Sequence, residues 1–499
     1  MNYHSTRSLD ESLTSRGAVL KGLADDGGLF VTDMLSETTI APTSLLGGNY
    51  VLTARRVLGA LLPDYTSEEI ADAVEAAYGA TFTAPEVTPV TRLGELALLE
   101  LYHGPTAAFK DVALCMLPQL MSKALRGSER RIMIATATSG DTGKAALEGF
   151  RDVPNIGITV LYPEGGVSAI QQLQMATQAG ENVTILAVKG NFDDAQSAVK
   201  ALFANDVVKK QLERMNVSLS SANSINIGRL VPQIVYYFEA WRQLVERNTI
   251  RPDELVDFTV PTGNFGDILA GWCAKRMGLP VGRLIVASNA NNVLTDFLKT
   301  GVYDRRRALQ KTLSPSMDIL VSSNLERVLY WLDAELEGPE VAAAHTRERM
   351  AQLATNGYYT VSDALLARLQ TEFGYGFADD SATRESIHDA WEKDGRLIDP
   401  HTAIARRVAL ENLTPGRQMV VLSTASPYKF CSAVYEAIFG ELPLNASPFD
   451  LMDALEARTQ VPAPTCLKSL RDRPVRWTET RDIAEVPNRV LEAAKTRIH

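Results

Sequence analysis

The stretch SGDTGK, residues 139–144, has residue types that could do chemistry. It looks like a nucleotide-binding loop, whose pattern is Gly, four residues, then Gly-Lys-Ser/Thr. Thr138 stands where the first glycine belongs and Ala145 where the Mg²⁺-binding hydroxyl belongs, so a nucleotide site is not supported. A glycine turn before a helix still binds anions, carboxylates included, through free N–H groups. An ordinary capped turn explains the same residues, and Lys144 is then expected on the helix surface.

Lys110 lies between Phe109 and Asp111 in an otherwise apolar stretch, residues 101–121, at the expected start of a helix. A desolvated lysine has a lowered pKa, so its amine becomes a nucleophile towards carbonyl groups and a usable base. The other interpretation is a surface lysine that extends from a helix into water. The stretch alone favours the surface lysine.

The segment TGNFGD, residues 262–267, follows a predicted strand that ends at Pro261 and leads into a helix. It does not fit Gly-x-Gly-x-x-Gly, so it does not favour a dinucleotide. Two glycines around a short polar turn can direct several N–H groups at one phosphate, with the helix dipole behind them.

Two further polar segments lie at predicted strand or helix ends. The stretch VVLSTASPYKF, residues 420–430, is a buried strand that ends in hydroxyl residues, the position at which ligands meet α/β sheets. Asn223, Ser224 and Asn226 precede a helix with Arg229 in its first turn, and this group could bind an anion. Simple capping explains both segments equally well.

Composition limits the function classes. A chain of 499 residues is expected to form two or three packed units, and a net charge of −10 argues against a nucleic-acid partner. We find neither a signal peptide nor a run of eighteen apolar residues, so no membrane partner is expected. The four cysteines and six histidines are scattered, which predicts no metal site and free thiols in a reducing, cytoplasmic compartment.

Short β-branched runs alternate with longer helical patterns from about residue 131 to residue 440. This alternation predicts an α/β protein with parallel sheets that are covered on both faces. Residues 49–62 and 67–80 instead read as amphipathic helices, so a mostly helical unit is expected at the N-terminus.

Six stretches, taken together and in order, resemble the threonine synthase family of the long microbial and fungal type. They are GLADDGGLF (22–30), HGPTAAFKD (103–111), TATSGDTG (136–143), NSIN (223–226), TGNFGD (262–267) and STASPYKF (423–430). The resemblance implies pyridoxal 5′-phosphate as cofactor. It also implies fold type II, the fold of the tryptophan synthase β-like enzymes: two open, mostly parallel sheets flanked by helices, here with a helical N-terminal unit.

The expected division of the chain follows from this resemblance and from the pattern of elements. Residues 1–98 would form a mostly helical N-terminal domain. Residues 99–130 and 223–440 would form a large α/β domain that binds the cofactor, and residues 131–222 a small mobile α/β domain. Residues 441–499 would add C-terminal helices and loops.

The resemblance also implies roles for single residues. Lys110 would bind the cofactor as a Schiff base, and Thr424 would hydrogen-bond its pyridine nitrogen. The cofactor phosphate would lie in the turn formed by Gly263, Asn264, Phe265, Gly266 and Asp267. The substrate carboxylate would bind at Ser139, Gly140, Asp141 and Thr142, and the substrate phosphate at Asn223, Ser224 and Arg229.

Two positions depart from the family pattern. Many relatives read Thr-Ala-His-Pro-Ala-Lys-Phe where this chain reads TASPYKF, residues 424–430, so Ser426 replaces a histidine and receives no acid–base role. Asp141 stands where other fold type II enzymes often carry asparagine. A carboxylate there would repel the phenolic oxygen of the cofactor, which leaves the partner of that oxygen open.

The implied reaction converts O-phospho-L-homoserine and water to L-threonine and phosphate, in a monomer or homodimer. One alternative is a threonine-synthase-like phospho-lyase that releases phosphate, ammonia and 2-oxobutyrate. Another is a non-catalytic protein that keeps the fold for binding. The intact Lys110, glycine turn and Thr424 count against the non-catalytic protein, whereas the sequence does not separate the two enzymes.

Overall fold

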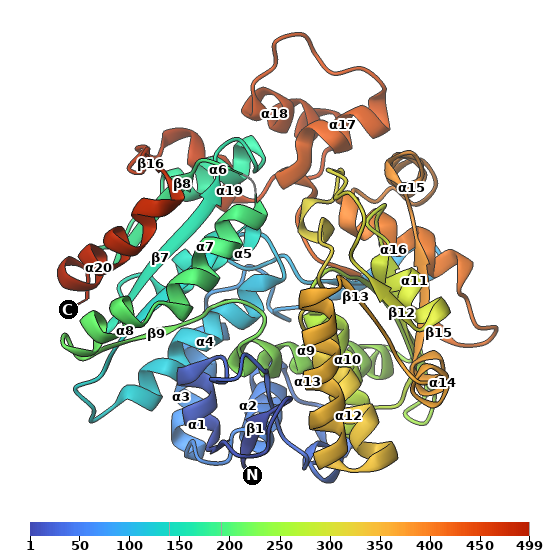
Figure 1. Cartoon of the computed structure of the whole chain (residues 1–499). Coiled ribbons are helices and arrows are strands. Elements are labelled where there is room, and N and C mark those ends of the chain that lie inside the picture. The colour runs from blue at the N-terminus through green and yellow to red at the C-terminus, as the bar shows by residue number, and fades with distance from the viewer. Residues whose placement is uncertain (139, 191, 499) are drawn as a thin grey trace.

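The computed structural model describes residues 1–138, 140–190 and 192–498 and confirms the α/β class (Figure 1). Its larger sheet has six strands in the order β14-β11-β10-β15-β5-β4, parallel except for β4 at the edge. Central strands β10 and β15 are buried along almost their whole length, as parallel strands covered on both faces must be. The six strands are β4 Val90–Leu93, β5 Leu96–Glu100, β10 Val256–Pro261, β11 Val281–Ser288, β14 Phe373–Phe377 and β15 Gln418–Ser423.

The smaller sheet has five strands in the order β16-β8-β7-β6-β9, and every pairing described in it is parallel. Strand β16 comes from the C-terminal segment and pairs with β8, so the end of the chain returns to the smaller sheet (Figure 1). The strands are β6 Arg131–Ala137, β7 Ile156–Pro163, β8 Val183–Val188, β9 Val217–Ser220 and β16 Thr480–Arg481.

The N-terminal segment contains the two expected amphipathic helices, α2 and α3, together with α1 and a small antiparallel sheet in the order β2-β1-β3. Helix α3 begins with a capping box, in which Thr66 and Glu69 satisfy each other's backbone N–H groups. These elements are α1 Ser15–Lys21, α2 Tyr50–Leu61, α3 Ser67–Tyr78, β1 Tyr3–Ser5, β2 Ser12–Leu13 and β3 Phe30–Val31.

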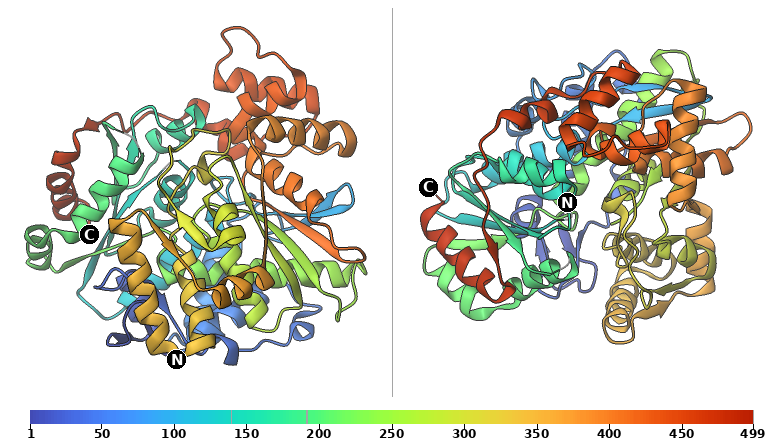
Figure 2. Two further views of the ribbon diagram at one scale, coloured as in Figure 1. Left: turned by 45° about the vertical axis from the view of Figure 1, so that its right-hand side comes forward. Right: turned by 90° about the horizontal axis from the view of Figure 1, so that it is seen from above.

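Helices cover the two large sheets, which lie on opposite sides of the molecule when it is viewed from above (Figure 2). Flanking the smaller sheet are α5 Asp141–Phe150, α6 Ala169–Ala176, α7 Phe192–Ala204, α8 Asp206–Glu213 and α20 Val486–Thr496. The remaining elements are α11 Val293–Thr300, β12 Val302–Asp304, α12 Leu325–Glu337, α13 Pro339–Thr355, β13 Tyr358–Thr360, α14 Asp363–Glu372, α15 Asp380–Asp394, α16 Pro400–Glu411, α17 Cys431–Phe439, α18 Pro448–Thr459 and α19 Thr465–Lys468.

Three helices pack in series through the middle of the molecule. They are α4 Lys110–Leu125, α9 Ile227–Glu246 and α10 Gly266–Arg276. Helix α4 packs against α5 on one side and α9 on the other, and α9 packs against α10. Helix α9 is buried from Ile227 to Leu244, and its buried residues include polar side chains such as Arg229, Gln233 and Glu239. Among the described helices, none has both the length and the apolar character needed to cross a membrane.

The central strands should carry much of the stability. Leu422 lies in β15 with no exposed surface, whereas Leu444 follows α17 and is 95% exposed. Leu422→Ala should lower the free energy of unfolding by about 2–5 kcal/mol, because it removes buried methyl groups and leaves a cavity. Leu444→Ala, the same change at an exposed position, should alter it by less than about 0.5 kcal/mol. Urea unfolding of both variants measures the difference; equal losses would contradict the arrangement of the core.

Candidate active site

The segment that leads into α4 is held against the segment that follows β15. Phe109 N–H donates to the carbonyl of Thr424 at 2.8 Å, and Ser426 N–H donates to the carbonyl of Ala107 at 3.0 Å. Ala107 has a left-handed backbone with φ of 59°, a conformation that costs energy for a residue with a side chain. These contacts fix Lys110, the first residue of α4, beside Thr424.

Lys110 is half-buried, and its ammonium group lies 4.5 Å from the ring centre of Phe109. Burial is the largest cause that lowers the pKa of Lys110, to about 8, and the positive charges of Arg229 and Lys429 lower it further. The carboxyl groups of Asp141 and Asp267 oppose this change. The surface-lysine alternative is therefore excluded, and the amine has the lowered proton affinity that a nucleophile or base needs.

The turn before α10 is fixed by its backbone carbonyls. Ser322 Oγ donates to the carbonyl of Gly263 at 2.7 Å, and Asn324 donates to the carbonyl of Asn264 through its backbone N–H and its side chain. Phe265 has a left-handed backbone (φ 63°) and no side chain caps the helix. The N–H groups of the first turn of α10 thus remain available to an anion.

Asp267 points its carboxyl group away from this turn. Tyr236 and Tyr237 donate to its Oδ1 at 2.5 Å and 3.0 Å. Burial raises the pKa of Asp267 to about 6 against the opposing effect of these hydrogen bonds, and its Oδ2 has no partner. At the turn itself, Asp267 offers its backbone N–H.

The turn before α5 is organised by Thr138, whose Oγ1 accepts hydrogen bonds from the N–H groups of Gly140 and Gly143. Ser139 lies outside the described residues. Gly140 has φ of 133° and touches Gln171, so a side chain at this position would be strained and crowded. Helix α5 starts at Asp141 without a side-chain cap, which leaves backbone N–H groups near Thr142 for a carboxylate.

The surface position expected for Lys144 is wrong. Only 3% of this residue is exposed, and its ammonium group pairs with Glu148 at 2.9 Å and with Gln178. Most of α5 is buried, so the face that carries Lys144 packs inward. Lys144 therefore forms a structural ion pair one turn after Asp141.

Arg229 is buried in α9 and has no carboxylate partner among the described residues. Its Nη1 donates to the carbonyl of Ala222 at 2.6 Å, and its Nε has no partner. Burial lowers the pKa of Arg229 to about 10, so the guanidinium remains charged. Nearby, Asn223 Oδ1 accepts a hydrogen bond from Thr136, and Ser224 lies beside Gly266. A buried cation without a counter-ion favours an anionic ligand.

These segments line one cavity of about 770 Å³ between the two large sheets. Of the residues predicted from the sequence, those at its surface are Lys110, Asp141, Thr142, Asn223, Ser224, Arg229, Gly263, Asn264, Phe265, Gly266, Asp267 and Thr424. Gly140 instead lies against Gln171.

The sequence analysis missed several residues that contact this site. Lys429 pairs with Asp141 at 2.6 Å, and Gln171 donates to the same carboxylate. His401 is buried at the cavity. Its Nδ1 donates to the Asp399 carboxylate at 2.6 Å, and the Nε2 of His401 accepts a hydrogen bond from Ser316 N–H at 3.3 Å. Asp399 could have been recognised as a helix cap followed by proline, but the position of its partner His401 at the cavity depends on tertiary packing.

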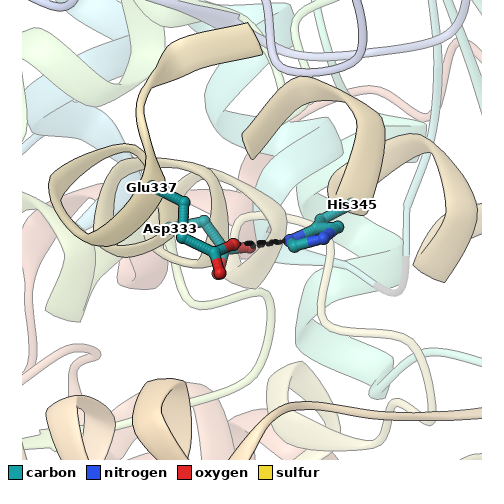
Figure 3. Close-up of side chains that lie close together, drawn as sticks. All are labelled: Asp333, Glu337 and His345. Carbon is teal, nitrogen blue, oxygen red and sulfur yellow. Dashed lines mark ion pairs between the residues drawn. The ribbon is translucent and has the colours of Figure 1, made fainter. Parts of the chain in front are cut away.

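A second group of ionisable side chains lies away from the cavity, between α12 and α13 (Figure 3). His345 Nδ1 lies 3.3 Å from Glu337 and 3.9 Å from Asp333, and Arg349 already pairs with Asp333. Because a guanidinium group balances the only buried carboxylate of the three, this cluster is an ion-pair network that joins the two helices.

The cavity has the parts that pyridoxal phosphate needs: a lysine of low proton affinity, an uncapped helix start for a phosphate, and a hydroxyl, Thr424, at the end of a central strand. Residues 81–371 match the sequence profile of the family described as "Pyridoxal-phosphate dependent enzyme". The protein is therefore a pyridoxal-phosphate enzyme with the fold type II architecture. The flanking residues 2–78 and 402–495 match the profiles "Threonine synthase N terminus" and "Threonine synthase, C-terminal".

Whole-chain comparisons agree with these profiles. Threonine synthase of Pseudomonas aeruginosa is 41% identical over 93% of this chain and 96% of that protein. A crystal structure of PLP-bound threonine synthase from Brucella melitensis is 38% identical, covers 99% of this chain and 100% of that chain, and superposes with a TM-score of 0.84. Human threonine synthase-like 1 is 39% identical over 84% of this chain and 57% of that protein. The chain belongs to the threonine synthase family, whose members are pyridoxal-phosphate-dependent lyases.

The guanidinium of Arg229 has no carboxylate partner among the described residues, so we expect the cavity to bind an anion even without cofactor. Inorganic phosphate at about 100 times its dissociation constant should stabilise the cofactor-free protein by about 2.7 kcal/mol. Arg229→Met should lose most of this gain, which thermal unfolding with and without phosphate measures. The control is Arg417→Met. Arg417 pairs with Asp257 at a distance of 3.0 Å and does not line the cavity. An equal phosphate effect in wild type and Arg229→Met would contradict the anion site.

Proposed function

We propose that the chain converts O-phospho-L-homoserine and water to L-threonine and phosphate, with Lys110 as the catalytic residue. The observation that carries this proposal is the meeting of three groups in one cavity: the Lys110 amine, the uncapped start of α10, and the unpaired Arg229. Membership of the threonine synthase family supports the reaction.

The cofactor would be held at three points. Lys110 would bind it covalently, and the backbone N–H groups of residues 263–267 would hold its phosphate against the dipole of α10. Thr424, at the end of β15, would hydrogen-bond its pyridine nitrogen and leave that nitrogen unprotonated, because a hydroxyl does not stabilise the added charge as a carboxylate would. When bound, pyridoxal phosphate supplies an electron sink for negative charge at the substrate α-carbon.

Lys110 would also move protons. Its lowered pKa, about 8, leaves part of the amine unprotonated near neutral pH and able to remove the proton at the α-carbon. The ring of Phe109 beneath the ammonium group limits where the amine can reach. One group can thus act first as the attachment point and then as the base.

The substrate would bind by its two anionic ends. The backbone N–H groups of Asp141 and Thr142 and the hydroxyl of Thr142 would receive the carboxylate at the start of α5, beside Gly140, whose own N–H is held by Thr138. Arg229, with Asn223 and Ser224, would receive the phosphate, because this buried guanidinium has no counter-ion of its own.

The two sheets would act as separate bodies during the reaction. We keep the division into residues 1–98, 99–130 with 223–440, 131–222, and 441–499 as a proposal, with two changes. Strands β4 and β5, residues 90–100, belong to the larger sheet, and β16 and α20 pack on the smaller sheet. Closure of the smaller body over the cavity would exclude water that does not take part. A cytoplasmic location, also proposed, is supported by four free cysteines.

Replacement of Lys110 should abolish cofactor attachment. The purified protein, reconstituted with pyridoxal phosphate, should be yellow, and Lys110→Ala should lose the visible absorption band and about a thousandfold in turnover rate. Lys144→Met, which removes another buried lysine, should keep the band. A colourless wild type after reconstitution would contradict the proposed cofactor site.

The product decides between the two reactions that the sequence left open. Incubation with O-phosphohomoserine should release phosphate and threonine in equal amounts, measured by phosphate assay and amino-acid chromatography. Phosphate accompanied by 2-oxobutyrate and ammonia, without threonine, would identify the phospho-lyase alternative and reject the synthase reaction.

A further inference from the structure

Among the described residues, Lys429 is a fully enclosed lysine that contacts Asp141 and has no role in the proposed reaction. It lies in the short 3₁₀ turn Pro427–Phe430 after β15, with no exposed side-chain surface. Its ammonium group donates to the carbonyl of Thr106 at 3.0 Å and pairs with Asp141 Oδ1 at 2.6 Å. Lys429 thus joins the segment before α4 to the start of α5.

Asp141 receives contacts from both halves of the molecule. Gln171, in α6 beside the smaller sheet, donates to Oδ1 at 2.9 Å. Ser316, from the segment before α12, donates to Oδ2 at 3.4 Å, and Lys429 follows the central strand of the larger sheet. The carboxylate therefore has one position, set by side chains from three separate parts of the chain.

The charge of Asp141 needs compensation where it lies. Burial alone would raise the pKa of this carboxyl group, but the ammonium groups of Lys429 and Lys110 hold it well below its usual range. An uncompensated charge in such a position is strongly unfavourable, whereas a hydrogen-bonded pair is tolerated. Lys429 remains the positive partner of Asp141 when the Lys110 nitrogen is bound to the cofactor.

Asp141 and Lys429 also shift the pKa of Lys110, in opposite directions. The Asp141 carboxylate favours the protonated form of the Lys110 nitrogen, and the Lys429 ammonium disfavours it. The other charged groups that face Lys110 are Arg229, which disfavours the protonated form, and Asp267, which favours it. The Lys429 ammonium therefore reduces the repulsion that a lone carboxylate at position 141 would exert on the phenolic oxygen of the cofactor.

We propose that Lys429 is a positioning residue, which fixes the Asp141 carboxylate between the two sheets and cancels its charge beside Lys110. This inference rests on the proposed attachment of the cofactor to Lys110. It assigns a task to the lysine of the segment STASPYKF, from which the sequence assigned only Thr424.

The direct test is a pH titration of the visible spectrum, which changes when the nitrogen that links Lys110 to the cofactor loses its proton. Lys429→Met should raise the pH midpoint of this spectral change by about one unit, because the uncompensated Asp141 carboxylate then stabilises the protonated nitrogen. Asp141→Asn should lower the midpoint by a similar amount, because the Lys429 ammonium is left to destabilise the protonated form. The double variant should return to within about half a unit of wild type.

The matched control is Lys144→Met, which removes a buried, ion-paired lysine from the same helix as Asp141 without acting on Lys110. Its midpoint should stay at the wild-type value. The inference is overturned if Lys429→Met shifts the midpoint no more than this control does, or in the same direction as Asp141→Asn. A wild type that binds no cofactor would instead reject the proposed function on which the inference rests.

If a single variant is too unstable to bind cofactor, the pair can be tested instead by the melting temperatures of the cofactor-free proteins. Each single variant leaves one buried charge without its partner, so the double variant should melt at a higher temperature than either. A double variant no more stable than the weaker single variant would show that the two groups do not act as a pair, and would also overturn the inference.

Discussion

The amine of Lys110 must be shielded from water and must still meet several charged groups, and this requirement explains much of the architecture. Helix α4 carries the lysine at its first residue and packs between α5 and α9, so the amine lies between the two large sheets. The ends of β10 and β15 bring the turn at residues 263–267 and Thr424 to the same cavity. In parallel sheets the carboxyl ends of neighbouring strands share one edge, which makes this convergence possible.

Charge balance in the cavity is the second constraint. Arg229 is a buried cation without a counter-ion, and Asp267 is a buried carboxyl group with one oxygen unpartnered. Asp141, by contrast, is fully compensated by Lys429. The charge of Asp141 is thus balanced inside the cavity, whereas the charge of Arg229 is not, and an uncompensated buried cation suits an anionic ligand.

Local sequence patterns predicted where the segments of the candidate site lie in the fold, whereas the roles of their residues were implied only by the family resemblance. The glycine turn before α10, the lysine at the start of α4 and the hydroxyl residues after β15 each lie where the strand–helix pattern put them. Lys144 was wrongly placed on the surface, because the face of α5 that packs inward depends on helix α4 and the smaller sheet. Lys429, Gln171 and His401 were missed for the same reason: Lys429 and Gln171 reach the site through Asp141, and His401 contacts Ser316, so each contact joins residues that are far apart in the sequence.

The proposed reaction depends most directly on the attachment of the cofactor to Lys110. Borohydride reduction of the reconstituted protein fixes the lysine–cofactor linkage, and peptide mass spectrometry then locates the modified residue. The account predicts a stoichiometric adduct on the peptide that contains Lys110. An adduct on Lys429 or Lys144, with Lys110 unmodified, would contradict it.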